Sequence, residues 1–139
     1  MKQSKSLARS VCPIANTLDL VGDKWSLLVV RDMLHGKSTY GELLDSPERI
    51  PTNILADRLR RLEEAGVIAS AAYQERPVRY AYSLTKKGAE LGEILLALAH
   101  WGKKHILGTR TYRESSSRLE QRNSAKLAVG SRSNRRRTR

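Results

Sequence analysis

The sequence of 139 residues contains a single cysteine, Cys12, and no phenylalanine. One cysteine excludes a disulfide within the chain and is typical of a reducing compartment such as the cytoplasm. No apolar run approaches the roughly 18 residues that span a bilayer, and the first residues lack the apolar segment of a signal peptide. We therefore expect a soluble, cytoplasmic protein with no membrane partner.

Catalytic and metal-binding motifs are also missing from the sequence. The three histidines, His35, His100 and His105, do not stand with another histidine, a cysteine or a carboxylate at the spacing of a metal site. There is no phosphate-binding glycine loop, and no serine, cysteine or lysine has the setting of a catalytic nucleophile. We expect no metal, no cofactor and no enzymatic activity.

Acidic residues are few relative to basic ones: 14 Asp and Glu stand against 26 Lys and Arg, which gives a formal net charge of +12. Residues 110–139 supply +8 of this charge, and the rest of the chain supplies +4. Such an excess favours an anionic partner, either nucleic acid or a lipid surface. We expect a flexible basic arm over residues 1–10, a folded domain over 11–108, and a basic, mostly disordered tail over 109–139.

Residues 51–66 predict an amphipathic helix with chemically marked ends. Pro51 suits the first helical turn, and Gly66 suits the left-handed residue just past a helix end. The apolar side chains of this stretch fall on one narrow stripe: Leu55, Leu59 and Leu62. One face of this helix is therefore expected to join the core, and the other to remain open.

Thr52, Asn53 and Arg60 lie on the open side, and their hydroxyl, amide and guanidinium groups can contact base edges in a DNA major groove. An ordinary solvated helix carries a similar face, so the neighbouring segments must decide between the two interpretations. Thr39 and Glu42 form a capping box that predicts a short helix through Leu44, and turn-forming residues follow it. Two short helices joined in this way make a helix-turn-helix.

Two helices are expected before this motif. Apolar residues at intervals of four and three predict a helix from Ile14 that Gly22 ends, and Lys24 to Gly36 predicts a more deeply buried helix. The apolar residues of the second helix lie on most of its sides: Leu27, Leu28, Val30, Met33 and Leu34. We expect this second helix to be the centre of the core.

Two strands follow the helix-turn-helix, over residues 67–73 and 78–84, with residues 74–77 as the tip. A hairpin in this position is a wing, and Arg76 and Arg79 at its tip would reach phosphate or the minor groove. The alternative is a plain hairpin that covers the core with one row of side chains: Val78, Tyr80 and Tyr82. Both interpretations can hold, because alternate residues of a strand face opposite ways.

Thr85 can cap the final helix, whose apolar stripe is long for the edge of a small domain. The stripe contains Leu91, Ile94, Leu95, Leu98, Trp101 and His105. A second copy of the chain is its simplest cover, joined by the apolar face of the first helix. We therefore predict a mainly α fold with a small β-hairpin (α+β), a winged helix-turn-helix that forms a homodimer through its terminal helices, with these dimerisation residues: Ile14, Leu18, Leu95, Leu98 and Trp101.

Several short motifs occur together and in order: Cys12-Pro13, Gly22-Asp23-Lys24-Trp25, Tyr40-Gly41-Glu42-Leu43, Tyr80-Ala81-Tyr82-Ser83-Leu84-Thr85 and Trp101-Gly102. They resemble the HxlR-type winged helix-turn-helix transcription regulators of bacteria, over about Cys12 to Gly102. The resemblance implies a homodimer that binds a pseudo-palindromic operator, usually to repress and sometimes to activate. Two positions depart from the family pattern: Pro51 stands where a serine is frequent, and Thr39 where a basic residue is frequent.

We therefore expect a sequence-specific regulator, a repressor of transcription whose partner is double-stranded DNA. Thr52, Asn53 and Arg60 are the candidates for the major groove, and Asp57 beside them could select a cytosine amino group. The candidates for phosphate contacts are Lys37, Ser38 and Arg58, together with Arg76 and Arg79 from the wing. The alternative is a non-specific architectural DNA- or RNA-binding protein whose affinity lies in the basic tail.

Cys12 is the one residue that points to an effector. Some members of the family that the chain resembles look like thiol sensors with a cysteine just before the first helix. The positive end of a helix and the nearby cations Lys5 and Arg9 favour the thiolate, which is the form that oxidants attack. The alternative is an inert, buried thiol, with a small-molecule effector or none.

Overall fold

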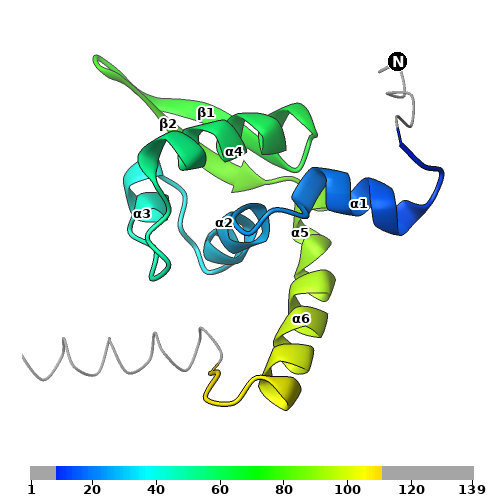
Figure 1. The fold of residues 1–139 in the computed structure, drawn as a ribbon. Helices are drawn as coiled ribbons and strands as arrows, with labels where there is room; N and C mark the ends of the chain where they lie inside the picture. The colour runs from blue at the N-terminus through cyan, green and yellow to red at the C-terminus, as the bar shows by residue number, and fades with distance from the viewer. Residues whose placement is uncertain (1–8, 111–139) are drawn as a thin grey trace, which may run out of the picture. The chain divides into compact units, whose positions relative to one another are not determined.

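The computed structural model describes residues 9–110, so most of the predicted basic arm and of the predicted tail lies outside the described residues. The described residues divide into two compact units, with the boundary between Leu95 and Leu96. The described elements are α1 (Pro13–Val21), α2 (Ser26–Leu34), α3 (Tyr40–Leu44), α4 (Thr52–Glu64), β1 (Ile68–Glu75), β2 (Val78–Leu84), α5 (Lys86–Ala89) and α6 (Leu91–His105) (Figure 1). The prediction of a mainly helical fold with one β-hairpin is confirmed.

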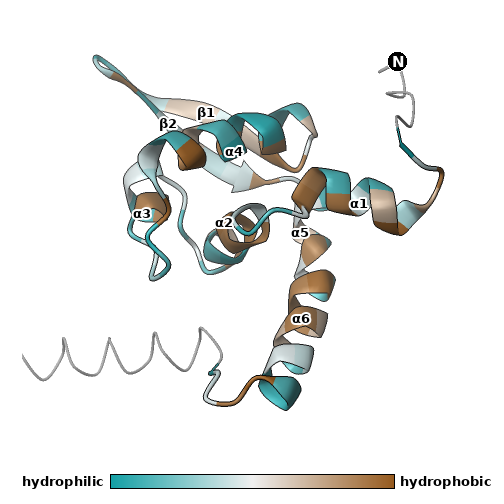
Figure 2. Ribbon diagram, in the orientation of Figure 1, coloured by the Kyte–Doolittle hydropathy of each residue, from teal (hydrophilic) through white to brown (hydrophobic). Residues whose placement is uncertain are grey.

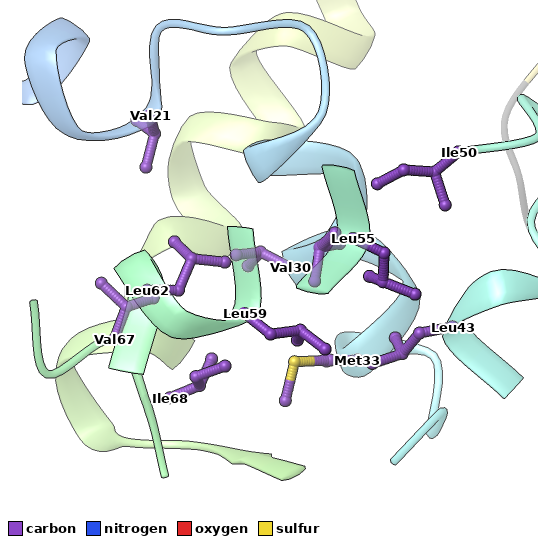
Figure 3. Packing of buried hydrophobic residues seen from close by; sticks show 11 residues of the cluster. Val21, Val30, Met33, Leu43, Ile50, Leu55, Leu59, Leu62, Val67 and Ile68 are labelled. Atoms are coloured by element: carbon purple, nitrogen blue, oxygen red, sulfur yellow. The ribbon is translucent and has the colours of Figure 1, made fainter. Parts of the chain in front are cut away.

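The core of the first unit is built from α2, α3, α4 and the start of β1. Figure 3 shows their side chains meeting in one cluster, with Val30 and Met33 of α2 facing the leucines of α4. The buried apolar residues are Val21, Val29, Val30, Met33, Leu43, Ile50, Leu55, Leu59, Leu62, Val67 and Ile68. The leucine stripe predicted for residues 51–66 is therefore the part of α4 that faces the core.

Helix α2 differs from its prediction at its start and along one side. It begins at Ser26 rather than at Lys24, and in the turn before it the Asp23 carboxylate accepts hydrogen bonds from the backbone N–H groups of Trp25 and Ser26, both at 3.0 Å. Leu34, which the pattern assigned to the core, is exposed. Helix α1 and its end at Gly22 are as predicted.

Both ends of α4 have defined backbone geometry. Pro51 has an extended conformation (φ −61°, ψ 145°) and is the residue before the helix, so its predicted place inside the first turn is wrong by one position. Gly66 has φ +73°, the left-handed conformation that the sequence predicted just past the helix end. The helix is thus fixed at its entry by proline and at its exit by glycine.

The hairpin is longer than predicted and projects beyond the core. The strands pair antiparallel from Ile68 opposite Leu84 to Glu75 opposite Val78, with an irregularity between Ala72 and Gln74. Only two residues connect the strands, where the sequence suggested four. Near the tip the side chains are exposed, and only Tyr82 and Leu84 of β2 pack against the core. The interpretation as a plain hairpin that covers the core therefore holds only for the base of the hairpin, and the outer part is a wing (Figure 1).

The helix expected after Thr85 is split at Glu90 into α5 and α6. Thr85 caps α5, where its side-chain oxygen accepts from Gly88 N–H at 3.1 Å. The same hydroxyl donates to the carbonyl oxygen of Gly66 at 2.6 Å, which ties α5 to the end of α4. Gly88 is buried, and a Cβ at this position would lie 2.0 Å from the Val67 carbonyl oxygen. Only glycine fits this junction.

Helices α1 and α6 contain apolar residues, coloured brown in Figure 2, and several of their side chains are exposed. Ile14 and Leu18 are 71% and 56% exposed, and Leu98 and Trp101 are 52% and 61% exposed. Leu95 differs, because it is half-buried and packs against the core cluster. Within the described residues, no helix combines the length and the apolar character required to cross a membrane.

Candidate nucleic-acid interface

The first turn of α4 is tied to α3 and so has a fixed place in the fold. The Tyr40 hydroxyl at the start of α3 donates to the backbone carbonyl oxygen of Thr52 at 2.8 Å. Helix α3 is itself capped by Thr39, whose side-chain oxygen accepts from Glu42 N–H at 3.3 Å and whose hydroxyl donates to the Glu42 carboxylate at 3.0 Å. The predicted cap at Thr39 is therefore present and begins the helix-turn-helix, and the Glu42 side chain bonds back to the Thr39 hydroxyl.

The turn between α3 and α4 is held by an ion pair with α2. The Arg31 guanidinium donates to both carboxylate oxygens of Glu48, at 2.7 and 2.8 Å, and the Ser46 hydroxyl donates to the same carboxylate at 2.8 Å. These hydrogen bonds, with that of Arg31 the largest cause, lower the pKa of Glu48 from 4.5 to about 2 despite partial burial. Arg49 follows in a left-handed conformation with φ +56° and is exposed. Hydrogen bonds thus hold the turn in place, and it presents one exposed cation, Arg49, next to α4.

The exposed face of α4 carries the three predicted base-contacting residues, Thr52, Asn53 and Arg60. Arg60 donates to Asp57 at 2.7 Å and to Glu64 at 3.2 Å, along the same helix. Asp57 is close to three arginines, and the hydrogen bond from Arg60 is the largest cause that lowers its pKa. This face is therefore polar and carries both signs of charge, with its arginine side chain partly ordered.

Arg58 has a different place from the one that the sequence suggested. Its side chain is only 16% exposed, and its Nε donates to Asp23 Oδ2 at 2.8 Å. A second group of the same guanidinium donates to Asp57. The predicted role of Arg58 as a phosphate contact remains a prediction, but in the structure this arginine joins α4 to the segment between α1 and α2.

The Asp23 carboxylate accepts four hydrogen bonds. Besides Arg58 and the two backbone N–H groups at the start of α2, it accepts from the Ser26 hydroxyl at 2.5 Å. Partial burial raises the pKa of Asp23, but the hydrogen bonds from Ser26 and Arg58 outweigh it and hold this pKa well below the usual range. Asp23 is therefore ionised when it holds Arg58.

The predicted cations of the wing are both exposed. Arg76 lies in the two-residue turn at the tip, and Arg79 is opposite Gln74 in the hairpin. The other two predicted phosphate contacts, Lys37 and Ser38, make hydrogen bonds within the fold. The Lys37 ammonium donates to the backbone carbonyl oxygen of Asp45 at 2.6 Å, and Ser38 accepts a bond from Tyr82 N–H at 2.7 Å through its backbone carbonyl oxygen. Among the predicted contact residues, the exposed cations Arg60, Arg76 and Arg79 thus lie on α4 and the wing.

The ion pairs of Asp23 with Arg58 and of Glu48 with Arg31 have no counterpart among the sequence-based predictions. Asp23 carried a recognisable signal, because an aspartate placed just before a helix is a preferred cap. Its second partner lies 35 residues later, and Glu48 and Arg31 are 17 residues apart. Local periodicity contains no information about such pairs.

Cys12 is the capping residue before α1, and its side chain is exposed, so the predicted alternative of a buried thiol is wrong. Arg9, expected to act on the thiol, forms an ion pair with Asp19 at 2.7 Å. The Asn16 side-chain amide donates to the backbone carbonyl oxygen of Cys12 at 2.8 Å. Across residues 9–110, no group of three His, Cys, Asp or Glu side chains is placed to hold a metal ion.

A short helix, a fixed turn, a second helix with an exposed polar face and a basic hairpin together define a winged helix-turn-helix protein of the DNA-binding class. The profile of the HxlR-like helix-turn-helix family matches residues 20–109. The chain belongs to this family of transcriptional regulators, which confirms the resemblance noted in the sequence and the expectation that the protein is not an enzyme.

Individual relatives agree with this assignment. The uncharacterized HTH-type transcriptional regulator sll1512 of Synechocystis is 41% identical over 92 residues, which cover 66% of this chain and 68% of that protein. The crystal structure of PA1607, a candidate transcription factor, is similar with a TM-score of 0.66 and 37% identity over 77% of this chain and 74% of that one. The redox regulator HypR in its oxidized form is similar with a TM-score of 0.59 and 33% identity over 72% of this chain and 99% of that one.

Proposed function

We propose that this regulator is a sequence-specific repressor that binds a pseudo-palindromic operator as a homodimer in the cytoplasm. The observation that carries the proposal is the exposed polar face of α4, presented by the anchored turn and flanked by the cations of the wing. Thr52, Asn53 and Arg60 contact base edges in the major groove, and Arg76 and Arg79 contact phosphate. Arg49 adds a positive charge where α4 begins.

The homodimer forms through the apolar faces of α1 and α6. Four exposed side chains support this part of the proposal: Ile14, Leu18, Leu98 and Trp101. Large apolar side chains that a helix leaves open to water frequently mark a surface that binds another protein. A dimer also has a geometric purpose, because two recognition helices about 34 Å apart read half-sites one DNA turn apart.

Selection of preferred sites from random DNA tests the proposal. The full chain should enrich a sequence with two related half-sites. Asn53→Ala and Arg60→Ala should each relax the preference at different base positions, whereas Arg79→Ala should weaken binding to all sequences about equally and reduce the salt dependence. Unchanged selection by Asn53→Ala, Arg60→Ala and their double variant would show that α4 does not read the bases.

The second candidate function is a non-specific architectural protein whose affinity lies in the basic tail. The net charge of +8 over residues 110–139 favours it. A chain that ends at Gly108 separates the two functions. A repressor should keep its site preference and bind non-specific DNA more weakly, with the log-log salt slope falling by about 0.9 for each phosphate that the tail no longer neutralises. Loss of all sequence preference on truncation would favour the architectural protein.

An oxidant is the effector that the chain supports best. Cys12 is exposed, and HypR, which is 33% identical, is a redox regulator. With one cysteine per chain, oxidation by diamide would join the thiols of two copies, or one thiol and a small thiol, in a disulfide while diamide takes up two electrons and two protons. Diamide should release wild-type protein from its operator and leave Cys12→Ser bound. Equal release from both proteins would exclude this effector.

A further inference from the structure

We propose that Asp23, which lies outside the exposed face of α4, is a positioning residue for base recognition by Arg60. It acts through a chain of alternating charges, Asp23, Arg58, Asp57 and Arg60, which we call the ion-pair chain. This inference rests on the proposed function, because it assigns a further specificity-determining residue to the same interface.

The inner end of the ion-pair chain is anchored in the core. Asp23 lies between α1 and α2, and its carboxylate is fixed by three hydrogen bonds from Trp25 and Ser26 at the start of α2, in addition to the one from Arg58. Helix α2 contains the fully buried Val30 and has little freedom to shift within the packed core. Asp23 therefore holds the Arg58 guanidinium at a fixed point of the fold.

Arg58 transmits this position to the surface. Its Nε is bonded to Asp23, and its Nη1 is bonded to Oδ2 of Asp57 on the exposed side of α4. A planar guanidinium held at two of its nitrogens has its orientation determined. The orientation of the Asp57 carboxylate is set in turn.

The outer end of the ion-pair chain is the candidate base contact. Oδ1 of Asp57 accepts from Nη2 of Arg60 at 2.7 Å, so the Arg60 side chain is partly ordered before DNA arrives. A free arginine on a helix surface has many rotamers, and ordering it on binding reduces affinity. Loss of the charge at Asp23 should therefore release Arg58, then Asp57, and finally leave Arg60 less ordered.

The experiment compares Asp23→Asn with Asp19→Asn in the full chain. The amide oxygen of asparagine can take the place of Oδ2, which accepts from Trp25 and Ser26 N–H, so Asp23→Asn should remove the charge and keep the start of α2. Asp19 is an exposed aspartate of α1 that pairs with Arg9 at 2.7 Å, so its replacement changes net charge equally without touching the ion-pair chain. Sites are selected from random DNA with both variants, Arg60→Ala and the double variant Asp23→Asn/Arg60→Ala, and thermal melting verifies folding.

Asp23→Asn should reduce the base preference by about 3- to 10-fold at the position that Arg60→Ala relaxes, and Asp19→Asn should not. Arg60→Ala should cost about 5- to 150-fold there, and the double variant should lose no more than Arg60→Ala alone. Arg58→Gln should reproduce the effect of Asp23→Asn at the same position, which provides a second test should Asp23→Asn unfold.

Three results would overturn the inference. Preference like that of wild type at every position in both Asp23→Asn and Arg58→Gln would mean that Asp23 only orders the start of α2. An equal loss across all positions would mean that Asp23 acts on the whole helix rather than on Arg60. A wild-type chain that selects no site would overturn the proposed function itself, and this inference with it, and that result is recognised before any variant is made.

Discussion

Helices α4 and α6 have apolar stripes with similar spacing but opposite surroundings. In α4 the three leucines are buried, whereas α6 has no buried residue and exposes Leu98 and Trp101. The spacing of apolar residues therefore identifies the apolar face of a helix without identifying what covers it. In α4 the cover is the chain itself, and in α6 the proposed cover is a second copy.

The two helices also offer different chemistry to a partner. Helix α4 uses its apolar side for the fold and presents Asn53 and Arg60, which suits the polar edges of bases. Helix α6 presents an indole and leucines, which suit another protein surface. On the proposed function, one helix is therefore a DNA-reading element and the other an assembly element.

The largest effect is expected from Leu59→Ala in α4. Leu59 is buried in the core cluster, so its truncation should lower the free energy of unfolding by about 2 to 5 kcal/mol. Urea denaturation at fixed protein concentration measures this change. Leu98→Ala in α6 is the matched control, and its effect should depend on protein concentration because it acts on association. Similar, concentration-independent losses in both variants would contradict the contrast between the two helices.

The next effect is expected from Trp101→Arg in α6. Interface tryptophans that anchor a dimer contribute at least about 2 kcal/mol, so the dissociation constant should rise by about 30-fold or more. Sedimentation at micromolar concentration would show monomers, and Lys104→Ala on the same helix is the control. Leu95→Arg is a poor test of dimerisation because Leu95 packs against the core. A Trp101→Arg variant that stays dimeric would show that α6 is not the assembly element.

The smallest effect is expected when low pH protonates Glu48 in the turn before α4. The pKa of Glu48 is lowered from 4.5 to about 2, so its pairing with Arg31 stabilises the fold above about pH 4.5 and is lost as the pH falls toward 2. The contribution should be about 1 kcal/mol or less, because solvent screens this partly exposed pair. Glu48→Gln should flatten the dependence of unfolding free energy on pH over this window, and Glu93→Gln in α6 is the control. An unchanged slope in Glu48→Gln would mean that the ion pair does not stabilise the turn.

Local patterns were enough to predict the helix-turn-helix and the orientation of α4. The Thr39 cap, the glycine after the helix and the leucine stripe each depend on neighbours within one or two turns. Such features are visible in a single sequence because the interacting residues are close along the chain.

The role of Arg58 could not be predicted in the same way. A helical wheel places it beside Arg61, and nothing nearby indicates that its partner is Asp23 on another element. The break at Glu90 was not predicted, because its backbone stays nearly helical (φ −64°, ψ −21°) and the flanking Gly88 and Gly92 do not by themselves indicate where a helix ends. Pairings between distant segments depend on the assembled fold, which determines which charges meet.

The exposed Cys12 before α1 has a practical consequence for spectroscopy. As the single cysteine of the chain, it accepts one thiol-reactive spin label or fluorophore at one known place, with no need to remove other thiols. A homodimer would then carry two identical labels and give one distance distribution. Because the proposed redox response releases DNA when Cys12 is modified, the distribution is recorded without operator DNA and would report the separation of the two first helices in the free dimer.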